Sequence, residues 1–418
     1  MASTEALQRG KRERATVVVV QLDFNTAFTS TNMNAVYRTL EAYGVPDADI
    51  ELLKRVQSGS WYSVTNSFGE TAACAIEKGM KQGDPTSPAR FLTFMDPLLR
   101  ALGASGCGWR PPPRRAAPEL KCRAGSGAGM VMTSESDPSP AFVDDVLLLA
   151  MGREAIPEAQ ELLGIIEAWE PWGGVRVNLN KSLCAAFDYG TNGPVSTADI
   201  TYKNVPLPAL AADEPLDYLG MLIDLSLNYK REKDRVLQTT RERVAMLSKA
   251  HFLSPSQRER VVQLAIVSVF RYTAGLVPWS LSELEDLTAE WVRGYRGAWG
   301  LPKSTDDSFF RVGRGFGGRG CPSALSVWTS ETVSLIPQCM RNPGVVGQLM
   351  VDDLQRVCVS RGCQTLFQLQ RMVRMIPLRT RESRVELLKS RLDCVGLDVM
   401  GTPWSAPSPG KLLLSKVV

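Results

Sequence analysis

Histidine and long apolar runs are what this chain of 418 residues most clearly lacks. His251 is the only histidine, which excludes a histidine-rich zinc site and the two-histidine helix of metalloproteases. The longer apolar runs, such as residues 261–270 with Gln263 and Ser268 inside, fall far short of the roughly 20 residues that cross a bilayer. We therefore expect no metalloprotease chemistry and no membrane partner.

Cysteine is present but forms no recognisable framework. The nine cysteines are odd in number and follow no repeating interval, unlike the paired cysteines of small secreted domains. The N-terminal basic residues are interrupted by Glu5 and Glu13, and no apolar signal region follows them. We expect an intracellular protein, with a nuclear or cytoplasmic location left open.

The composition is otherwise that of a folded protein. Hydrophobic residues make up 44% and charged residues 22% of the chain, which excludes disorder or a collagen-like repeat as a description of the whole. The length allows two or three globular units. The net charge is only +4, but residues 230–320 contain 16 basic and 10 acidic residues. This basic stretch is compatible with a face that meets nucleic-acid phosphates.

The first 220 residues alternate between strand and helix patterns. The β-branched run 15–22 predicts a buried strand that ends at Asp23, and Ser30 or Thr31 is expected to cap the next helix. Residues 61–66 and 71–76 are expected to pair as a hairpin, and Ser87 with Pro88 to open a helix. An irregular segment is expected over 103–140, followed by a hairpin whose tip holds Asp144 and Asp145. A helix over 157–169 and a strand over 175–179 complete the pattern.

From Tyr229 on, the apolar spacing becomes purely helical. Ser254 with Gln257, and Ser280 with Glu283, have the capping-box form that starts a helix. A basic, helical second unit is therefore predicted. Residues after 305 show only partial helical signals.

Three aspartates occupy apolar segments, where a folded protein seldom buries a carboxylate without a partner. Asp23 follows a buried strand, and Asp144 with Asp145 interrupts an apolar hairpin. Adjacent buried negative charges are costly unless a cation compensates them, and oxygen ligands without histidine suit Mg²⁺ or Mn²⁺. Two such ions about 4 Å apart support nucleotidyl transfer. The alternative, that Asp144 and Asp145 form a plain surface turn, stays open from the residues alone.

Five segments, in order, resemble the motifs of one polymerase family, the reverse transcriptase domain of non-LTR (LINE-like) retrotransposons. The resemblance covers about residues 15–224. The segments are LDFNTAF at 22–28 for motif A, KGMKQGDPTSPARF at 78–91 for motif B, AFVDD at 141–145 for motif C, GVRVNLNKS at 174–182 for motif D and YLGMLID at 218–224 for motif E.

The resemblance implies roles for individual residues. Asp23 and Asp144 would hold two Mg²⁺ (or Mn²⁺) ions, with Asp145 in a supporting role as a third metal and catalytic residue. Lys181 would be the general acid for pyrophosphate, although a solvated lysine at a strand end is an equal alternative. The residues implied to contact the nucleotide and template are Phe24 (through its carbonyl), Phe28, Gln82 and Gly83. Those implied to contact the primer strand are Tyr218, Leu219 and Gly220.

The implied fold class is α+β. An antiparallel palm sheet backed by helices would occupy residues 1–228 with a remnant of the fingers, a helical thumb residues 229–305 and a partly helical extension residues 306–418. Thumb arginines Arg235, Arg241, Arg243, Arg258 and Arg260 are candidates for phosphate contacts, or simply a solvated face. The Arg-Gly segment 311–320 is discounted as an RNA-binding repeat, because it resembles a Gly-Gly segment that follows the thumb in these elements.

The implied activity is RNA-directed DNA polymerisation, with an RNA template, a DNA primer and deoxynucleoside triphosphates as partners. The chain departs from the family before motif A, where about 14 residues stand in place of a fingers region of roughly a hundred. Arg9, Lys11, Arg12 and Arg14 are expected to belong to a helix that leads into motif A. The alternatives are a non-catalytic remnant that at most binds nucleic acid, and a group II intron-type reverse transcriptase with the same chemistry.

Overall fold

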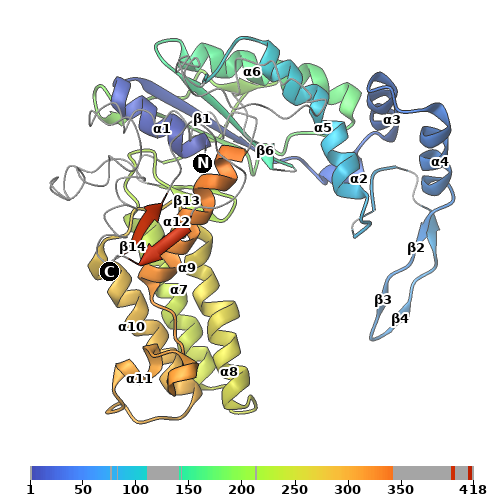
Figure 1. Ribbon diagram of the computed structural model, residues 1–418. Coiled ribbons are helices and arrows are strands. Elements are labelled where there is room, and N and C mark those ends of the chain that lie inside the picture. Colours follow the sequence, from blue (N-terminus) through green and yellow to red (C-terminus); the bar gives the residue numbers. More distant parts are fainter. Residues whose placement is uncertain are drawn as a thin grey trace.

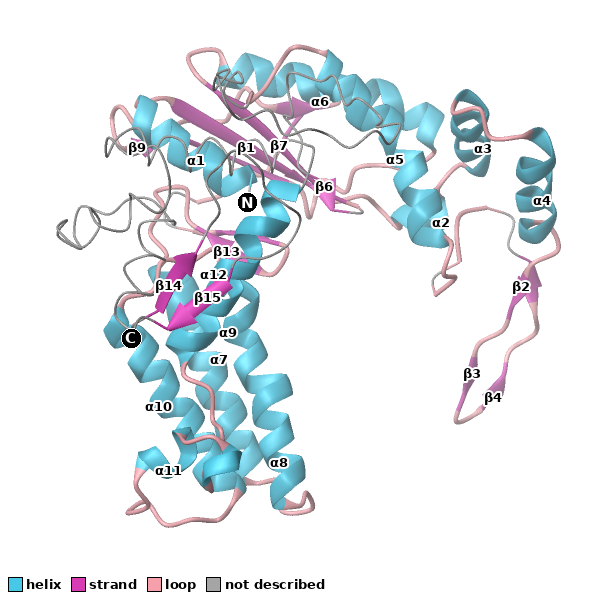
Figure 2. Cartoon of the chain, in the orientation of Figure 1, coloured by secondary structure: helices cyan, strands magenta, loops and turns pink. Residues whose placement is uncertain are grey.

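The computed structural model describes residues 2–75, 78–81, 83–110, 141–142, 144–211, 214–341, 397–400 and 413–416. Gln82 and most of the expected irregular segment, residues 111–140, lie outside this description. The described part has a unit of helices around a sheet and a helical bundle that projects from it (Figure 1). Both helices and antiparallel strands are present, which confirms the α+β class (Figure 2).

The central sheet is antiparallel and has the order β6-β7-β1-β8-β9. Strand β1 (Thr16–Leu22) lies in its middle, between β7 (Asp145–Met151) and β8 (Leu183–Asp188). The edges are the two short strands β6 (Ala141–Phe142) and β9 (Gly193–Pro194).

Both faces of this sheet are covered, which explains the continuous apolar run in β1. Val18, Val20 and Leu22 point into a core shared with α5 (Ser87–Ala104) and α6 (Ala155–Gly173). Val17 and Val19 point into a second core shared with α1 (Ala2–Glu13) and with the helical bundle. A strand buried on both faces reads as apolar at every position rather than at every second one. As expected, Arg9, Lys11 and Arg12 lie in the helix before β1, and Arg14 follows it directly.

The segment after β1 forms α2 (Ala27–Ser30), α3 (Met33–Ala42) and α4 (Asp47–Gln57). The expected cap of α3 is wrong. Asn32 caps it by accepting from the Asn34 N–H at 3.1 Å, while the buried Thr31 hydroxyl donates to the Ala27 carbonyl at 2.7 Å. Thr31 is unavailable because it closes α2 instead.

The hairpin expected after α4 is confirmed. Its outer pair is β2 (Trp61–Tyr62) with β5 (Cys74–Ala75), and its inner pair is β3 (Thr65–Asn66) with β4 (Gly69–Glu70). The hairpin and the helical bundle project from the same side of the sheet unit, with the β6 end between them (Figure 1).

The strand expected over residues 175–179 is wrong, because only one isolated bridge forms there, between Phe24 and Val177. Asn178 turns the chain instead. Its carbonyl accepts from the N–H groups of Lys181 and Ser182, at 3.1 and 2.9 Å. The apolar pattern of this segment reflects burial of Val175 and Val177 against α6, and the true strand, β8, begins at Leu183.

Short hairpins lead from the sheet to the bundle. They are β10 (Thr201–Tyr202) with β11 (Val205–Pro206), and β12 (Leu216–Tyr218) with β13 (Met221–Ile223). The bundle consists of α7 (Lys230–Ser248), α8 (Pro255–Val261), a π-helical turn η1 (Val262–Ile266), α9 (Val267–Ala274) and α10 (Leu281–Ala298), followed by α11 (Asp307–Arg311), the 3-10 turn η2 (Arg314–Phe316) and α12 (Ala324–Arg341). Farther along, β14 (Leu397–Met400) pairs with β15 (Leu413–Lys416).

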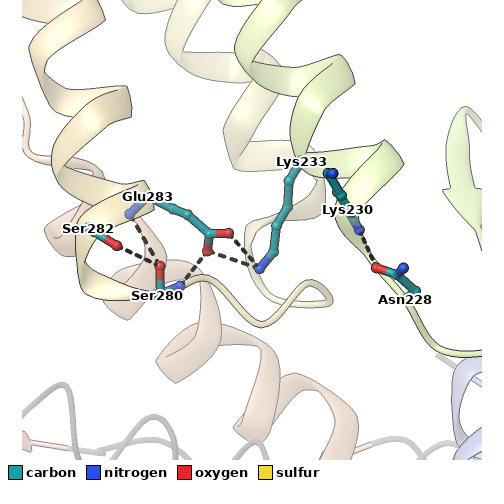
Figure 3. Close-up of polar contacts among 6 residues, drawn as sticks. All are labelled: Asn228, Lys230, Lys233, Ser280, Ser282 and Glu283. Atoms are coloured by element: carbon teal, nitrogen blue, oxygen red, sulfur yellow. Dashed lines mark hydrogen bonds and ion pairs between the residues drawn. The ribbon is translucent and has the colours of Figure 1, made fainter.

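Both capping boxes expected in the bundle are confirmed, at Ser254 with Gln257 and at Ser280 with Glu283. Figure 3 shows the second one: Glu283 accepts from the Ser280 N–H at 2.7 Å and from Lys233 Nζ at 2.9 Å. Lys233 lies on α7, so the cap of α10 also ties these two helices together. Among the described residues, no helix is long and apolar enough to cross a membrane.

Candidate active site

Asp23 lies at the end of β1, where the chain leaves the sheet. Its N–H donates to Ser182 Oγ at 3.1 Å and its carbonyl accepts from the Asn178 N–H at 2.7 Å. The Asn178 side-chain amide donates to Asp23 Oδ2 at 3.2 Å. The turn at 178–182 therefore fixes both the backbone and the carboxylate of Asp23.

Asp144 and Asp145 reach the same end of the sheet from the neighbouring strand. The register pairs Leu22 with Val146, so the next residue on each strand brings Asp23 beside Asp145. Asp145 is the first residue of β7, so that of the two aspartates Asp144 alone precedes the strand, in the connection to β6. The expected tip thus contains one of the two aspartates rather than both.

The electrostatics agree with this convergence. Burial, and then the negative charges of Asp144 and Asp23, raise the pKa of Asp145 above its ordinary value. The charges of Asp144 and Asp23 therefore add to burial in opposing ionisation of Asp145, as expected of a site that a cation would neutralise. In the described part of the chain, no group of three or more Asp, Glu, His or Cys side chains is arranged to hold one metal ion. Mg²⁺ is usually bound by one or two carboxylates together with substrate phosphates, so the site does not need three protein ligands to a single ion.

Phe28 lies on α2, five residues after Asp23 in the chain. Its ring stacks on that of Phe91 with centroids 4.6 Å apart and an interplanar angle of 16°. Phe91 is fully buried on α5, whereas Phe28 is half-buried. The stack holds one face of the Phe28 ring in place.

The segment before Gly83 packs directly on α2. The Met80 N–H donates to the Phe28 carbonyl at 2.7 Å, and a Cβ at Gly79 would lie 2.3 Å from the Thr29 carbonyl oxygen. Gly83 has a φ of +88° but open space around it. Gly79, which sequence reasoning missed, permits a close approach to α2, and the expected contact of Gly83 with template and nucleotide stays a prediction. Gln82 lies outside the described residues.

Phe24 and Lys181 differ in how firmly they are held. Phe24 is buried, and its ring meets that of Trp169 edge to face with centroids 6.2 Å apart. Lys181 is exposed, and its ammonium group makes no ion pair or hydrogen bond with another described residue. Lys181 follows Asn178 closely, so the turn that holds Asp23 also carries this lysine.

Tyr218, Leu219 and Gly220 form the turn of the β12–β13 hairpin. Tyr218 is buried; burial, and then the Asp145 charge, raise its pKa. The hairpin is attached to β1 as well, because Gln21 Nε2 donates to the Asp217 carbonyl at 3.1 Å. The structure thus brings Asp23, Asp145 and this turn into one neighbourhood.

Most of the expected phosphate-binding arginines are engaged within the protein. Arg235 pairs with Glu232 at 2.8 Å and Arg241 with Glu290 at 2.8 Å. Arg243 donates to the Ala265 carbonyl and Arg258 to the Leu253 carbonyl. Within the described chain, Arg260 alone of this set is exposed without such a partner.

The Arg-Gly segment after the bundle is also committed to the fold. Arg314 pairs with the buried Glu259 of α8, and the Arg319 guanidinium lies 3.6 Å from the centre of the Trp299 ring. A Cβ at Gly318 would lie 2.1 Å from the Val312 carbonyl oxygen, so this glycine is required for close packing. Because these side chains pack within the protein, the contacts agree with the expectation that this segment is not an RNA-binding repeat.

Asn178, Ser182 and Gln21 are the further site residues that sequence reasoning missed. The one available signal was their spacing: Gln21 stands two residues before Asp23, and Asn178 and Ser182 flank Lys181 inside a segment already singled out. A polar residue in an apolar strand, such as Gln21, marks a position whose side chain needs a hydrogen-bond partner.

Comparison with curated proteins gives relatives of one kind. The chain is 27% identical over 219 residues to the "Retrovirus-related Pol polyprotein from type-1 retrotransposable element R2" of Popillia japonica, covering 52% of this chain and 28% of that protein. It is 25% identical over 317 residues to the corresponding polyprotein from "type-2 retrotransposable element R2DM" of Drosophila melanogaster, covering 73% and 26%. The chain thus spans little more than a quarter of the length of these relatives.

Two solved structures, both of telomerase with the TWJ fragment of telomeric RNA, resemble this chain only distantly. The one from Candida albicans has a TM-score of 0.34 and 11% identity, covering 82% of this chain and 51% of that one. The one from Candida tropicalis has a TM-score of 0.36 and 10% identity, covering 84% and 52%. TM-scores this low do not establish a shared fold.

A family model described as "Reverse transcriptase (RNA-dependent DNA polymerase)" matches residues 1–223. This range contains the carboxylates, the Phe28 stack and the β12–β13 turn described above. Together with the relatives from R2 elements, the match confirms the expected likeness to a LINE-like reverse transcriptase domain. Because the match covers more than half of the chain, the chain belongs to the reverse transcriptase (RNA-dependent DNA polymerase) family.

Proposed function

We propose that this chain is an RNA-directed DNA polymerase that extends a DNA 3′-hydroxyl on an RNA template. The observation that carries the proposal is the convergence of Asp23, Asp144 and Asp145 at one end of the sheet, where their charges oppose one another. Family membership supports the class of reaction, and the convergence supports the proposal that it occurs at this end of the sheet. The partners are an RNA template, a DNA primer and deoxynucleoside triphosphates.

Asp23 and Asp144 are proposed to hold two divalent cations, Mg²⁺ or Mn²⁺, with Asp145 in support. The donor set fits, since all three side chains offer hard oxygen ligands. In addition, burial and then the charges of Asp144 and Asp23 raise the pKa of Asp145. When bound, the ions would activate the primer hydroxyl and stabilise the charge that develops on pyrophosphate. Asn178 and Ser182 contribute by keeping Asp23 in one orientation.

In the proposed transfer the primer 3′-hydroxyl loses its proton to solvent and its oxygen bonds to the α-phosphorus of the nucleotide, while the bond from that phosphorus to pyrophosphate breaks. Lys181 is proposed to give a proton to the leaving pyrophosphate; its ammonium group is exposed and pairs with no other residue of the described chain. Phe28 is proposed to select deoxynucleotides, because the stack on Phe91 fixes a ring edge that a ribose 2′-hydroxyl would meet. Gln82, Gly83 and the Phe24 carbonyl are proposed to contact the nucleotide and template.

The division into palm (1–228), thumb (229–305) and C-terminal extension (306–418) is part of the same proposal. The elements support it in so far as the sheet unit ends with β13 and the bundle begins with α7 at Lys230. The bundle and the β2–β5 hairpin would then flank the template and primer.

The test is primer extension on an annealed RNA template with deoxynucleotides and Mg²⁺ or Mn²⁺. We expect the wild-type chain to extend the primer and Asp144→Ala to lose at least about a hundredfold in rate while remaining folded. Asp199→Ala is the matched control, because Asp199 is exposed and distant in sequence from the motifs. RNA binding without metal-dependent extension would instead identify a non-catalytic nucleic-acid-binding protein and overturn the proposal.

A further inference from the structure

The turn between β12 and β13 adopts a conformation that its sequence does not favour. Leu219 has a φ of +52° and Gly220 a φ of +71°. Glycine takes this left-handed region freely, but in leucine the Cβ comes too close to the following carbonyl oxygen. A non-glycine residue stays in such a conformation only where its surroundings hold it there, and such residues concentrate at functional sites.

Three side chains from the helical bundle hold this turn. Tyr272 Oη of α9 donates to the Leu219 carbonyl at 2.5 Å, and Arg235 Nη2 of α7 donates to the Gly220 carbonyl at 2.7 Å. Glu232 Oε2, also of α7, accepts from the Leu222 N–H at 3.0 Å. Two helices therefore contact the backbone of three residues in the span from Leu219 to Leu222.

Glu232 and Arg235 act as one unit. The Glu232 side chain is fully buried, and its carboxylate accepts from Arg235 Nε at 2.9 Å and from Arg235 Nη2 at 2.8 Å. A bidentate pair of this kind fixes the plane of the guanidinium group. Because of that plane, Arg235 is directed at the turn rather than being available to a nucleic-acid phosphate.

The opposite side of the hairpin is attached to the catalytic strand. Gln21 of β1, two residues before Asp23, donates to the Asp217 carbonyl at 3.1 Å. Tyr218, at the base of the turn, is buried in the same core as Val19 of β1 and Leu147 of β7. The hairpin thus lies between the site of the proposed chemistry and the bundle that holds its turn.

We infer that Glu232, Arg235 and Tyr272 are positioning residues that hold the Leu219–Gly220 turn in its left-handed form, so that the turn sets the primer 3′ end against Asp23 and Asp144. This inference rests on the proposed polymerase function. A primer end displaced by about 1 Å reacts far more slowly although it still binds. The clamp therefore acts on the rate of transfer and not on the affinity for the duplex.

The kinetic test compares Tyr272→Phe and Arg235→Ala with the full wild-type chain in primer extension at saturating RNA–DNA duplex. Tyr272→Phe removes one hydrogen bond, and we expect kcat to fall about three- to tenfold; Arg235→Ala also frees Glu232, and we expect a larger fall. Duplex Kd should change less than about twofold in Tyr272→Phe. Arg293→Ala is the control for Arg235, because Arg293 forms an ion pair of the same spacing with Glu290. A weakened Kd with unchanged kcat would overturn the inference and make these residues phosphate contacts.

A second variant separates positioning from general damage to the fold. Leu219→Gly removes the conformational cost, so Leu219→Gly combined with Tyr272→Phe should recover most of the kcat lost in Tyr272→Phe alone. A residue that merely stabilises the bundle would show no such recovery, and an equal loss in the double variant would contradict the clamp.

Amide hydrogen exchange tests the clamp without any catalysis. We expect exchange at Leu219 to Leu222 to rise severalfold in Tyr272→Phe and in Arg235→Ala, with exchange in β1 and β7 unchanged. Unaltered exchange at the turn would overturn the clamp whatever the activity. A wild-type chain that extends no primer would overturn the proposed function itself, and the two failures are therefore distinguishable.

Discussion

Asn178 holds Asp23 at two points: its backbone N–H donates to the Asp23 carbonyl at 2.7 Å and its side-chain amide donates to Asp23 Oδ2 at 3.2 Å. The amide also accepts, through Oδ1, from the Asn180 N–H at 3.2 Å. A single side chain therefore shapes the turn after α6 and orients the carboxylate at the end of β1. Asn178 is the residue through which the segment resembling motif D acts on the proposed metal site.

The first prediction concerns this contact. Asn178→Asp keeps the acceptor for the Asn180 N–H but replaces the donor to Asp23 by a second negative charge. We expect the extension rate to fall at least about tenfold, because Asp23 loses its hydrogen bond and gains a repulsive neighbour. Steady-state primer extension over a range of Mg²⁺ concentrations measures this. Asn180→Asp, at an exposed position of the same turn, is the control and should stay within about twofold of wild type. An unaffected Asn178→Asp variant would show that Asp23 does not need this orientation.

The second prediction follows from the raised pKa of Asp145. A carboxyl whose pKa is raised by folding destabilises the folded state once it ionises, so stability is lost as the pH rises from the ordinary value near 3.8 through the raised pKa. Asp145→Asn removes that loss. Without divalent metal we expect the variant to melt at a higher temperature than wild type at pH 7, with the difference shrinking toward pH 4.

Thermal melts with chelator and with Mg²⁺ check this second prediction. Added Mg²⁺ should raise the melting temperature of the wild type more than that of Asp145→Asn, because the cation binds the ionised cluster. If the variant melts lower than wild type in chelator at pH 7, the carboxylates do not repel one another as described.

The third prediction concerns Gly79. A Cβ there would lie 2.3 Å from the Thr29 carbonyl oxygen, at a φ of +77°. Gly79→Ala should lower the free energy of unfolding by about 1–3 kcal/mol, since both overpacking and left-handed strain oppose it. Gly164→Ala on α6, where a Cβ meets nothing within 4 Å, should instead stabilise by about 0.5–1 kcal/mol. Urea unfolding measures the change in the free energy of unfolding for both variants. Equal changes in Gly79→Ala and Gly164→Ala would contradict the close packing of this segment on α2.

The fourth prediction separates Arg260 from Arg314. Arg260 is exposed and free of ion pairs within the described chain, so Arg260→Ala should weaken RNA–DNA duplex binding and reduce the salt slope by about 1. Arg314 neutralises the buried Glu259, so Arg314→Ala should lower the melting temperature and leave the salt slope unchanged. Duplex affinity measured at several salt concentrations tests both. The reverse pattern would mean that the Arg-Gly segment binds nucleic acid after all.

Strands and helices with strong local signals could be predicted from the sequence. The run in β1, the hairpin after α4 and the capping boxes at Ser254 and Ser280 depend on residues close together in the chain, and the structure confirms them. Where the prediction failed, a distant contact decided the outcome. The segment 175–179 has a strand-like apolar pattern, but its valines are buried against α6 and Asn178 turns the chain toward Asp23.

The site was predictable by residue type but not by partner. The sequence indicates three carboxylates as candidate metal ligands. Nothing local reveals that Gln21 attaches β1 to β12 or that Arg235 donates to the Gly220 carbonyl. In the sequence Arg235 is an ordinary basic residue of a helix. The structure shows that it pairs with Glu232, whose side chain is fully buried. Such pairings arise between segments far apart in the chain, and one sequence carries no record of them.

The most direct test of the central claim is incorporation of a single deoxynucleotide onto a DNA primer annealed to RNA, with the wild type compared with Asp23→Asn. The substitution keeps the size of the side chain and its hydrogen bond acceptor but removes the charge. We predict incorporation by the wild type that depends on Mg²⁺ or Mn²⁺, and a loss of at least about a hundredfold in Asp23→Asn with an unchanged melting profile. Incorporation at the wild-type rate by a folded Asp23→Asn chain would contradict the account.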